Sequence, residues 1–197
     1  MPRGVPLTQE AEAQRRQEIR DAALALFVAK GYRQTSMREV AEASGAGKST
    51  LYDYFRTKEE ILASILDGAM AAVIEQLRTI AGSDAPPDAR LRQIMAANLA
   101  FMQNNANLNL RLSMESRHLT PEHQRRLQER RYEHQDLVGR VIQDGIDQGR
   151  FRRVDPLVAA RMLLTAMQPV LFTTRPTGSS EEMLAETVEI FMRGISQ

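Results

Sequence analysis

Residues 36–55 read SMREVAEASGAGKSTLYDYF, and this stretch decides which class of fold the chain adopts. Its second half looks like the phosphate-binding loop of nucleotide hydrolases, which requires G-x-x-x-x-G-K-[ST] between a buried strand and a helix. Glu42 stands where the first glycine of that motif belongs, and Met37 and Val40 before it follow helical spacing. The motif therefore lacks its structural context, and a nucleotide-binding enzyme that uses GAGKST becomes a minor alternative.

The same stretch fits two short helices joined by a turn that contains glycine. Ser36 and Glu39 form a capping-box pair that begins the first helix, and Gly45 ends it. Residues 48–55 then form a second short helix that buries Leu51. Two such helices describe a helix-turn-helix, whose second member lies in the DNA major groove. An ordinary helical hairpin, with the tyrosines of the second helix partly buried, is the alternative.

Helical patterns extend from this stretch in both directions. Upstream, apolar residues at spacings of three and four predict a helix over about 9–30, with Gly31 as its C-terminal cap. Downstream, Thr57 and Glu60 form the capping box of a long amphipathic helix, and glycine and two prolines make residues 81–89 a linker.

More helices are predicted beyond that linker. The first follows it directly, and the second runs from about 121 to 148 with Gly149 after it. A proline at 156 begins another, and Ser179 with Glu182 forms the capping box of the last. Apolar residues alternate over 108–114 as they would in a strand, but nothing else in the chain can pair with one, so a short helix is preferred. The predicted fold class is all-α.

Composition indicates an ordinary globular protein. The chain of 197 residues is 43% apolar and contains no cysteine, which excludes disulfides and Cys-ligated metal sites. The histidines, His118, His123 and His134, lack metal-ligand spacing, so we expect no metal and no cofactor. Neither a membrane span nor a signal peptide is evident, and we expect a cytoplasmic protein with no membrane partner.

Charge is distributed unevenly along the chain. Residues 1–58 hold ten Lys and Arg against seven Asp and Glu, a balance of +3, whereas residues 59–197 hold sixteen against eighteen, a balance of −2. This difference permits an N-terminal segment that faces DNA, without proving it.

Residues 18–66, EIRDAALALFVAKGYRQTSMREVAEASGAGKSTLYDYFRTKEEILASIL, resemble the N-terminal domain of the TetR/AcrR family of transcriptional repressors. The AALALF helix, the KGY exit, the TSMREVAEASG support helix, the KSTLYDYF recognition helix and the TKEEIL start follow in the order of that family. The resemblance implies a three-helix helix-turn-helix DNA-binding domain over 1–58. A larger helical ligand-binding and dimerisation domain over 59–197 would follow, with about nine helices in all and no enzymatic activity.

The resemblance also assigns side chains to double-stranded DNA. The residues expected to contact it are Thr35, Ser36, Arg38, Lys48, Ser49, Thr50, Tyr52, Asp53, Tyr54 and Lys58. Gly47 departs from the family, which usually has serine there, so bare backbone replaces a side-chain cap. Asp53 departs too, because an acid repels phosphate. It accepts a hydrogen bond from a cytosine amino group or, alternatively, it points to solvent or pairs with Arg56 or Lys48.

The rest of the chain resembles the family only in its pattern of helices. Family members dimerise through their last two helices, which predicts a homodimer interface near Leu163, Leu164, Met167, Val170, Leu171, Val188, Phe191 and Met192. Packing within the monomer is the alternative for each of these residues.

A pocket for an inducer is expected among the middle helices. Its candidate residues are Met95, Asn98, Phe101, Met102, Met114, Glu115, His118, Tyr132, Met162 and Gln168. Residues 115–134 resemble a subset of the family linked to acyl-CoA and lipid degradation. Their arginines would meet a CoA phosphate or, alternatively, form a solvated charged helix face.

The expected function is a homodimeric repressor that binds a palindromic operator. A small-molecule inducer, such as a lipid or an acyl-CoA, would release it. A regulator without an inducer pocket is the second hypothesis.

Overall fold

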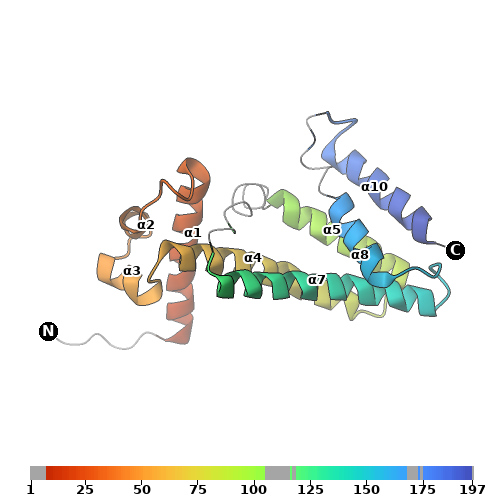
Figure 1. Cartoon of the computed structure of the whole chain (residues 1–197), viewed down its shortest axis with the longest axis horizontal. Coiled ribbons are helices and arrows are strands. Elements are labelled where there is room, and N and C mark those ends of the chain that lie inside the picture. Colours follow the sequence, from red (N-terminus) through yellow and green to blue (C-terminus); the bar gives the residue numbers. More distant parts are fainter. Residues whose placement is uncertain (1–7, 105–115, 117–118, 168–172, 174, 197) are drawn as a thin grey trace. The chain divides into compact units, whose positions relative to one another are not determined.

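The structure, a computed structural model, describes residues 8–104, 116, 119–167, 173 and 175–196. These residues contain eight helices and no strand, which confirms the all-α prediction (Figure 1). A single isolated bridge joins Phe151 to Ser196. The helix predicted at 108–114 lies outside the described residues.

The eight helices follow the predicted order. They are α1 (Gln9–Lys30), α2 (Met37–Ala43), α3 (Lys48–Tyr54), α4 (Lys58–Ala81), α5 (Pro87–Asn104), α7 (Pro121–Asp147), α8 (Pro156–Ala166) and α10 (Ser180–Ile195). None of them combines the length and the apolarity that crossing a bilayer requires.

Local sequence explains where the helices begin. Ser36 and Ser179 each form a complete capping box, with Glu39 and Glu182 as the partners that return a hydrogen bond. The box predicted for Thr57 differs in one contact. Its hydroxyl accepts the Glu60 N–H at 3.1 Å, but the Glu60 carboxylate accepts from the preceding residue, at 2.7 Å from the Arg56 nitrogen.

Glycines end three of the helices. Gly31, Gly45 and Gly149 have φ angles of 97°, 63° and 67°, a left-handed conformation that other residues rarely adopt. Gly31 follows α1 and Gly45 follows α2, so these two glycines lie on either side of α2.

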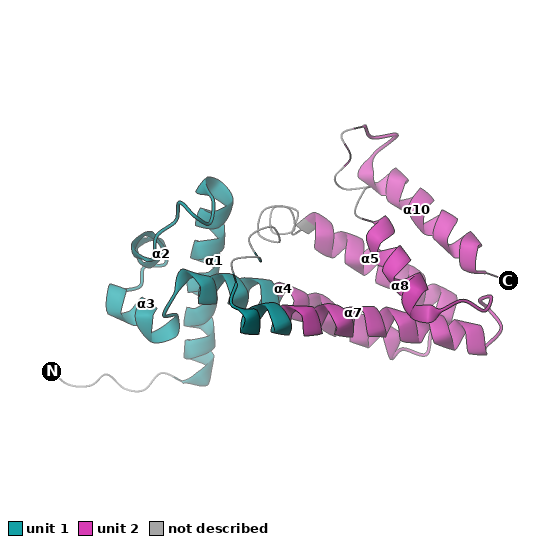
Figure 2. Cartoon of the chain, viewed as in Figure 1, with its two compact units in different colours: residues 1–68, 107–126 teal, residues 69–106, 127–197 magenta. Residues whose placement is uncertain are grey.

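The described residues fall into two compact units, shown in two colours in Figure 2. Unit 1 lies within residues 1–68 and 107–126, and unit 2 within 69–106 and 127–197. Residues of α4 and of α7 therefore contribute to both units. The predicted functional boundary at residue 58 stays a prediction.

The core of unit 1 contains apolar residues of α1, α2 and α3. Ile19 and Phe27 of α1, Val40 of α2 and Leu51 of α3 are each 0% exposed. Tyr32 packs edge-on against Phe27, with ring centroids 5.2 Å apart. Apolar residues at helical spacing thus hold α2 and α3 against α1.

Unit 2 has a larger core drawn from all of its helices. Its fully buried members include Ile74, Leu77, Leu91, Ile94, Met95, Val138, Val141, Ile142, Ala160 and Leu163. Phe151 also lies in it, packed directly on Gly145, where a Cβ atom would come 2.1 Å from a ring carbon. Only glycine at position 145 therefore lets the ring pack there.

Candidate functional site

The turn between α2 and α3 shows what the GAGKST sequence forms. The element before it is the helix α2 rather than a strand, so the strand-loop-helix arrangement of a nucleotide-binding loop is missing here. Gly47 is the N-cap of α3, with φ −61° and ψ 151°, and no side chain caps the helix. The replacement of a side-chain cap by bare backbone, predicted from Gly47, is confirmed.

Side chains of α3 divide into an inner and an outer face. Leu51 is fully buried, while Lys48, Ser49 and Asp53 are exposed and Thr50 and Tyr54 are half-buried. Tyr52 is 43% exposed, which disfavours the alternative of a buried tyrosine at this position, whereas the half-buried Tyr54 fits that alternative. All six predicted contacts on α3 have accessible surface, and three of them, Lys48, Ser49 and Thr50, lie in the first turn, where backbone N–H groups attract anions.

At the start of α2, one of the three predicted contacts lies inside the protein. Ser36 and Arg38 are exposed, the first within its capping box and the second in an ion pair with Glu42 at 2.9 Å. Thr35 is only 2% exposed, and its hydroxyl donates to the Gly31 carbonyl at 2.9 Å. The hydroxyl therefore stabilises the segment before α2, and a contact between Thr35 and DNA stays a prediction.

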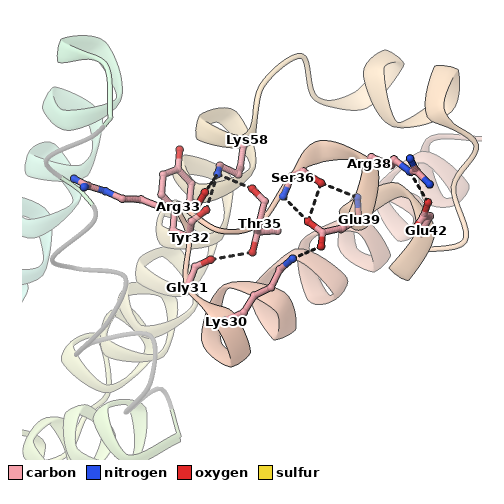
Figure 3. A network of polar contacts seen from close by, with 10 residues as sticks. All are labelled: Lys30, Gly31, Tyr32, Arg33, Thr35, Ser36, Arg38, Glu39, Glu42 and Lys58. Atoms are coloured by element: carbon pink, nitrogen blue, oxygen red, sulfur yellow. Dashed lines mark hydrogen bonds and ion pairs between the residues drawn. The ribbon is translucent and has the colours of Figure 1, made fainter.

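A carboxylate close to these residues is held ionised. Lys30 forms an ion pair with Glu39, and together with hydrogen bonds from Ser36 it lowers the pKa of Glu39 to about 2 (Figure 3). The capping box of α2 is therefore maintained across the physiological pH range.

Lys58 has a different environment from the one predicted. Its ammonium donates to carbonyl oxygens in the segment between α1 and α2 rather than projecting to solvent (Figure 3). Lys58 is nevertheless the predicted phosphate contact at the start of α4. That assignment stays a prediction.

Two arginines of α1 that the sequence did not single out hold the ends of the short helices. Arg15 donates to the carbonyls of Ser44 and Gly45, at 3.4 and 3.1 Å, in the turn after α2. Arg16 donates to the Tyr54 carbonyl at 3.3 Å and lies 5.4 Å from the centre of that ring. Their partners lie about 30 or more residues away, so no local pattern points to them.

In unit 2, the predicted pocket residues separate into three groups. Met95 and Asn98 are buried, and Phe101 and Met102 are half-buried beside them on α5. Tyr132 and Met162 are 56% and 63% exposed, on α7 and α8. The remaining candidates, Met114, Glu115, His118 and Gln168, lie outside the described residues.

One buried polar pair stands out among these apolar residues. The amide nitrogen of Asn98 donates to the Ile94 carbonyl at 3.1 Å, and its oxygen lies 2.8 Å from Nε2 of His134. Burial lowers the pKa of His134 to about 4, so the ring is neutral at pH 7. Sequence spacing gave no reason to place this histidine beside Asn98, because the two lie on different helices.

Two arginines in the charged segment at the start of α7 form ion pairs with acidic side chains. Arg126 forms an ion pair with Asp67 at 3.0 Å and Arg130 one with Glu133 at 3.4 Å, while Arg125 and Arg131 are exposed. Arg117, the remaining arginine named for this segment, lies outside the described residues.

Three of the predicted dimer residues are buried within the protein. Leu163 and Met192 lie in the main core of unit 2, and Met167 lies in a smaller cluster with Leu99 and Leu184, which fits the alternative of packing within the monomer. Of the others, Leu164, Val188 and Phe191 are half-buried, and Val170 and Leu171 lie outside the described residues.

The exposed apolar surface of α8 and α10 is formed by residues other than those predicted for the dimer interface. Val158, Met162 and Ile190 are 46%, 63% and 65% exposed. They line an apolar groove of about 470 Å³ between α8 and α10, together with the half-buried Phe191. A large exposed apolar groove of this kind is typical of a protein–protein contact.

Comparisons with known proteins agree with this geometry. The profile "Bacterial regulatory proteins, tetR family" matches residues 19–65, and "Tetracyclin repressor-like, C-terminal domain" matches residues 84–195. The repressor KstR2 of Rhodococcus jostii is 29% identical over 84% of this chain and 82% of its own.

Solved structures share the same fold. A TetR/AcrR regulator from Thermobifida fusca has a TM-score of 0.78 and 27% identity, covering 92% of this chain and 98% of its own. AibR, solved with isovaleryl coenzyme A and operator DNA, has a TM-score of 0.73 and 27% identity, covering 89% and 97%.

Proposed function

We propose a function that starts from one premise: this chain belongs to the tetR family of bacterial regulatory proteins. As a member of that family it is a DNA-binding transcriptional regulator. We infer that it acts in the cytoplasm, without catalysis, as a repressor that binds a palindromic operator as a homodimer. A small molecule then releases it.

One observation carries the DNA-binding part of this proposal. The outer face of α3 presents a cation, small hydroxyl groups and an exposed tyrosine, namely Lys48, Ser49, Thr50 and Tyr52. Hydroxyl groups close to a helix N-terminus are suited to base edges and phosphates, and a lysine neutralises phosphate. We therefore assign α3 to the major groove.

The groove between α8 and α10 supports a homodimer. We propose that Met162 and Ile190 pack against the same residues of a second copy, because a two-fold contact is self-complementary. A dimer presents two copies of α3, which read two half-sites and multiply specificity over a single helix.

For the inducer we propose an acyl-CoA thioester. The proposal draws on AibR, whose complex contains isovaleryl coenzyme A, and on the neutral Asn98–His134 pair in unit 2. We propose that this hydrogen-bonded polar pair, among apolar side chains, orients the carbonyl of the acyl chain.

The DNA-binding part is tested by selection from random duplexes, followed by fluorescence anisotropy on the selected site. Lys48→Ala combined with Tyr54→Ala should weaken binding at least tenfold, because a phosphate cation and a half-buried aromatic of α3 are lost. Arg131→Ala with Tyr132→Ala also removes one cation and one tyrosine, but from α7, and should leave affinity unchanged. Equal affinity of both double variants would exclude α3 as the reading surface.

The ligand part has its own test. Isovaleryl-CoA and longer acyl-CoA thioesters are titrated into the protein–DNA complex, with free coenzyme A as the control. Release by a thioester but not by coenzyme A is expected, because only the thioester carries the acyl chain. If no thioester displaces the DNA, the acyl-CoA assignment fails while the DNA-binding assignment stands.

A further inference from the structure

We infer that Asp53 determines part of the operator sequence, because its carboxylate accepts a hydrogen bond from the amino group of one cytosine in each half-site. The inference rests on the function proposed above, which assigns α3 to the major groove, and it adds a base that one side chain of α3 reads. Asp53 lies in the last turn of α3 and is exposed. Its acid group is the feature of α3 that a general affinity for phosphate does not explain.

Asp53 lies on the side of α3 that points away from the core. Leu51, the fully buried residue of this helix, marks the inner side. Successive residues turn by about 100°, so Ser49 and Asp53 both point within roughly 20° of the direction opposite to Leu51. Both side chains are exposed, as that direction requires. A helix that packs on its inner side enters a groove with its outer side, so these two side chains reach deepest toward the base edges.

The flanks of the helix carry residues that suit phosphates. By the same rotation, Lys48 and Tyr52 lie on one flank of α3, and Thr50 and Tyr54 lie on the other. The two sugar–phosphate backbones line the edges of the major groove, which is about 12 Å wide. Groups on the flanks are therefore placed to meet phosphates, whereas Asp53 lies between them, where an acid is farthest from both backbones. This central position reduces the repulsion between the carboxylate and phosphate.

The carboxylate of Asp53 has no partner within the part of the chain that the structure describes. It forms neither an ion pair nor a side-chain hydrogen bond there, so neither Lys48 nor Arg56 neutralises it. Water solvates this exposed acid in the free protein. In the groove that water is displaced, and a charged acceptor that loses water without gaining a donor is costly. The donor must therefore come from the DNA.

Base edges in the major groove offer two such donors, cytosine N4 and adenine N6, while guanine and thymine present acceptors. Adenine places its N7 acceptor beside the amino group, and this acceptor repels the second oxygen of a carboxylate. Cytosine presents its amino group without a second acceptor on the same base. An ionised carboxylate has no donor, so cytosine fits it best.

Scanning the base pairs of the selected operator measures this role. The operator is changed one base pair at a time, symmetrically in both half-sites, and affinity is measured by fluorescence anisotropy. For the wild type, one C·G position should lose affinity by roughly tenfold or more with any other pair. Asp53→Ala should reduce that loss to about threefold or less and keep the preferences at the other positions. Asp84→Ala, which removes an exposed acid between α4 and α5, is the control and should keep every preference.

A modified duplex tests the atom that Asp53 contacts. N4-methylcytosine still pairs with guanine, but a methyl group replaces the amino hydrogen that faces the major groove. At the position identified by the scan, this base should weaken wild-type binding by roughly tenfold, whereas Asp53→Ala should bind both duplexes equally. The loss is measured on the wild-type protein, so it does not depend on the folding of a variant.

Three results would overturn the inference. Asp53→Ala keeps the wild-type preference at every position, the position that depends on Asp53 is an A·T pair, or the methyl group leaves wild-type affinity unchanged. In each case the wild-type protein still binds its operator, so the proposed function stands. If the wild-type protein selects no duplex, the proposed function fails, and the role of Asp53 fails with it.

Discussion

His134 donates from Nε2 to the Asn98 oxygen at 2.8 Å, a hydrogen bond between α7 and α5 beside the apolar core of unit 2. The assignment follows from Asn98, whose amide nitrogen already donates to the Ile94 carbonyl, so that its oxygen faces the ring. The proton of the neutral imidazole therefore resides on Nε2.

This pair predicts a loss of stability in mild acid. The folded protein has a pKa of about 4 for His134 against 6.5 ordinarily, so between these values only the unfolded chain binds the proton. The free energy of unfolding should then fall as pH drops from about 6.5 to about 4, by at most roughly 3 kcal/mol.

Urea unfolding at several pH values measures that loss. His134→Gln should flatten the dependence, whereas His123→Gln, at the start of α7, should retain it. Parallel curves for the wild type and His134→Gln would show that another group is responsible.

A second prediction concerns the carboxylate of Glu39. Its pKa, lowered to about 2 by Lys30 first and by Ser36 second, should rise toward 4.5 in Lys30→Met and by less in Ser36→Ala. The lowered pKa means that the stabilising contacts are complete above about pH 4.5 and are lost as pH falls toward 2. NMR titration of the Glu39 side chain measures each value, and a wild-type pKa in Lys30→Met would refute the ion pair.

Gly145 gives a third prediction, on packing. Gly145→Ala should destabilise the protein by roughly 2–3 kcal/mol, because the new Cβ atom meets the buried Phe151 ring. Gly68→Ala, in α4, is the control, since a Cβ atom there meets only the end of the Arg20 side chain, at 3.6 Å, an ordinary contact. Thermal unfolding of both variants decides, and equal midpoints would contradict the close packing on Phe151.

The fourth prediction addresses the groove between α8 and α10. Ile190→Glu places a charge in a surface that we propose to be buried in the dimer, and it should yield monomers at micromolar concentration. Tyr132→Glu, at an exposed aromatic on α7, should leave the dimer intact. Sedimentation velocity measures both, and a dimeric Ile190→Glu protein would locate the interface elsewhere.

Local sequence predicted most of the helices and their ends. Ser36 and Ser179 were assigned as caps from residues three positions away, and Gly31 and Gly149 from their place after a periodic run. Such signals depend on neighbours in the chain, so they can be interpreted without knowledge of tertiary packing.

The face that a side chain presents was harder to predict. Met162 and Leu163 are adjacent and equally apolar, yet one is 63% exposed and the other fully buried, because successive helical residues point about 100° apart. Composition cannot choose between them until the packing of α8 is known. The same holds for Thr35, whose burial depends on a hydrogen bond within a segment that has no periodicity.

Long cationic side chains were the least predictable part of the candidate site. Arg16 and Lys58 reach carbonyls 38 and up to 26 residues away in the chain. A lysine or arginine beside a recognition helix favours the interpretation as a phosphate contact, since nothing in the sequence shows that backbone oxygens compete for it.

The bare glycine cap of α3 has a consequence for the release of water on operator binding. Because Gly47 supplies no side-chain acceptor, water must satisfy the first amide groups of α3 in the free protein. Each of these waters is released when an acceptor on DNA takes its place. Operator binding should therefore tighten with increasing osmolality. In Gly47→Ser the new hydroxyl already accepts from the helix, so this dependence should be weaker.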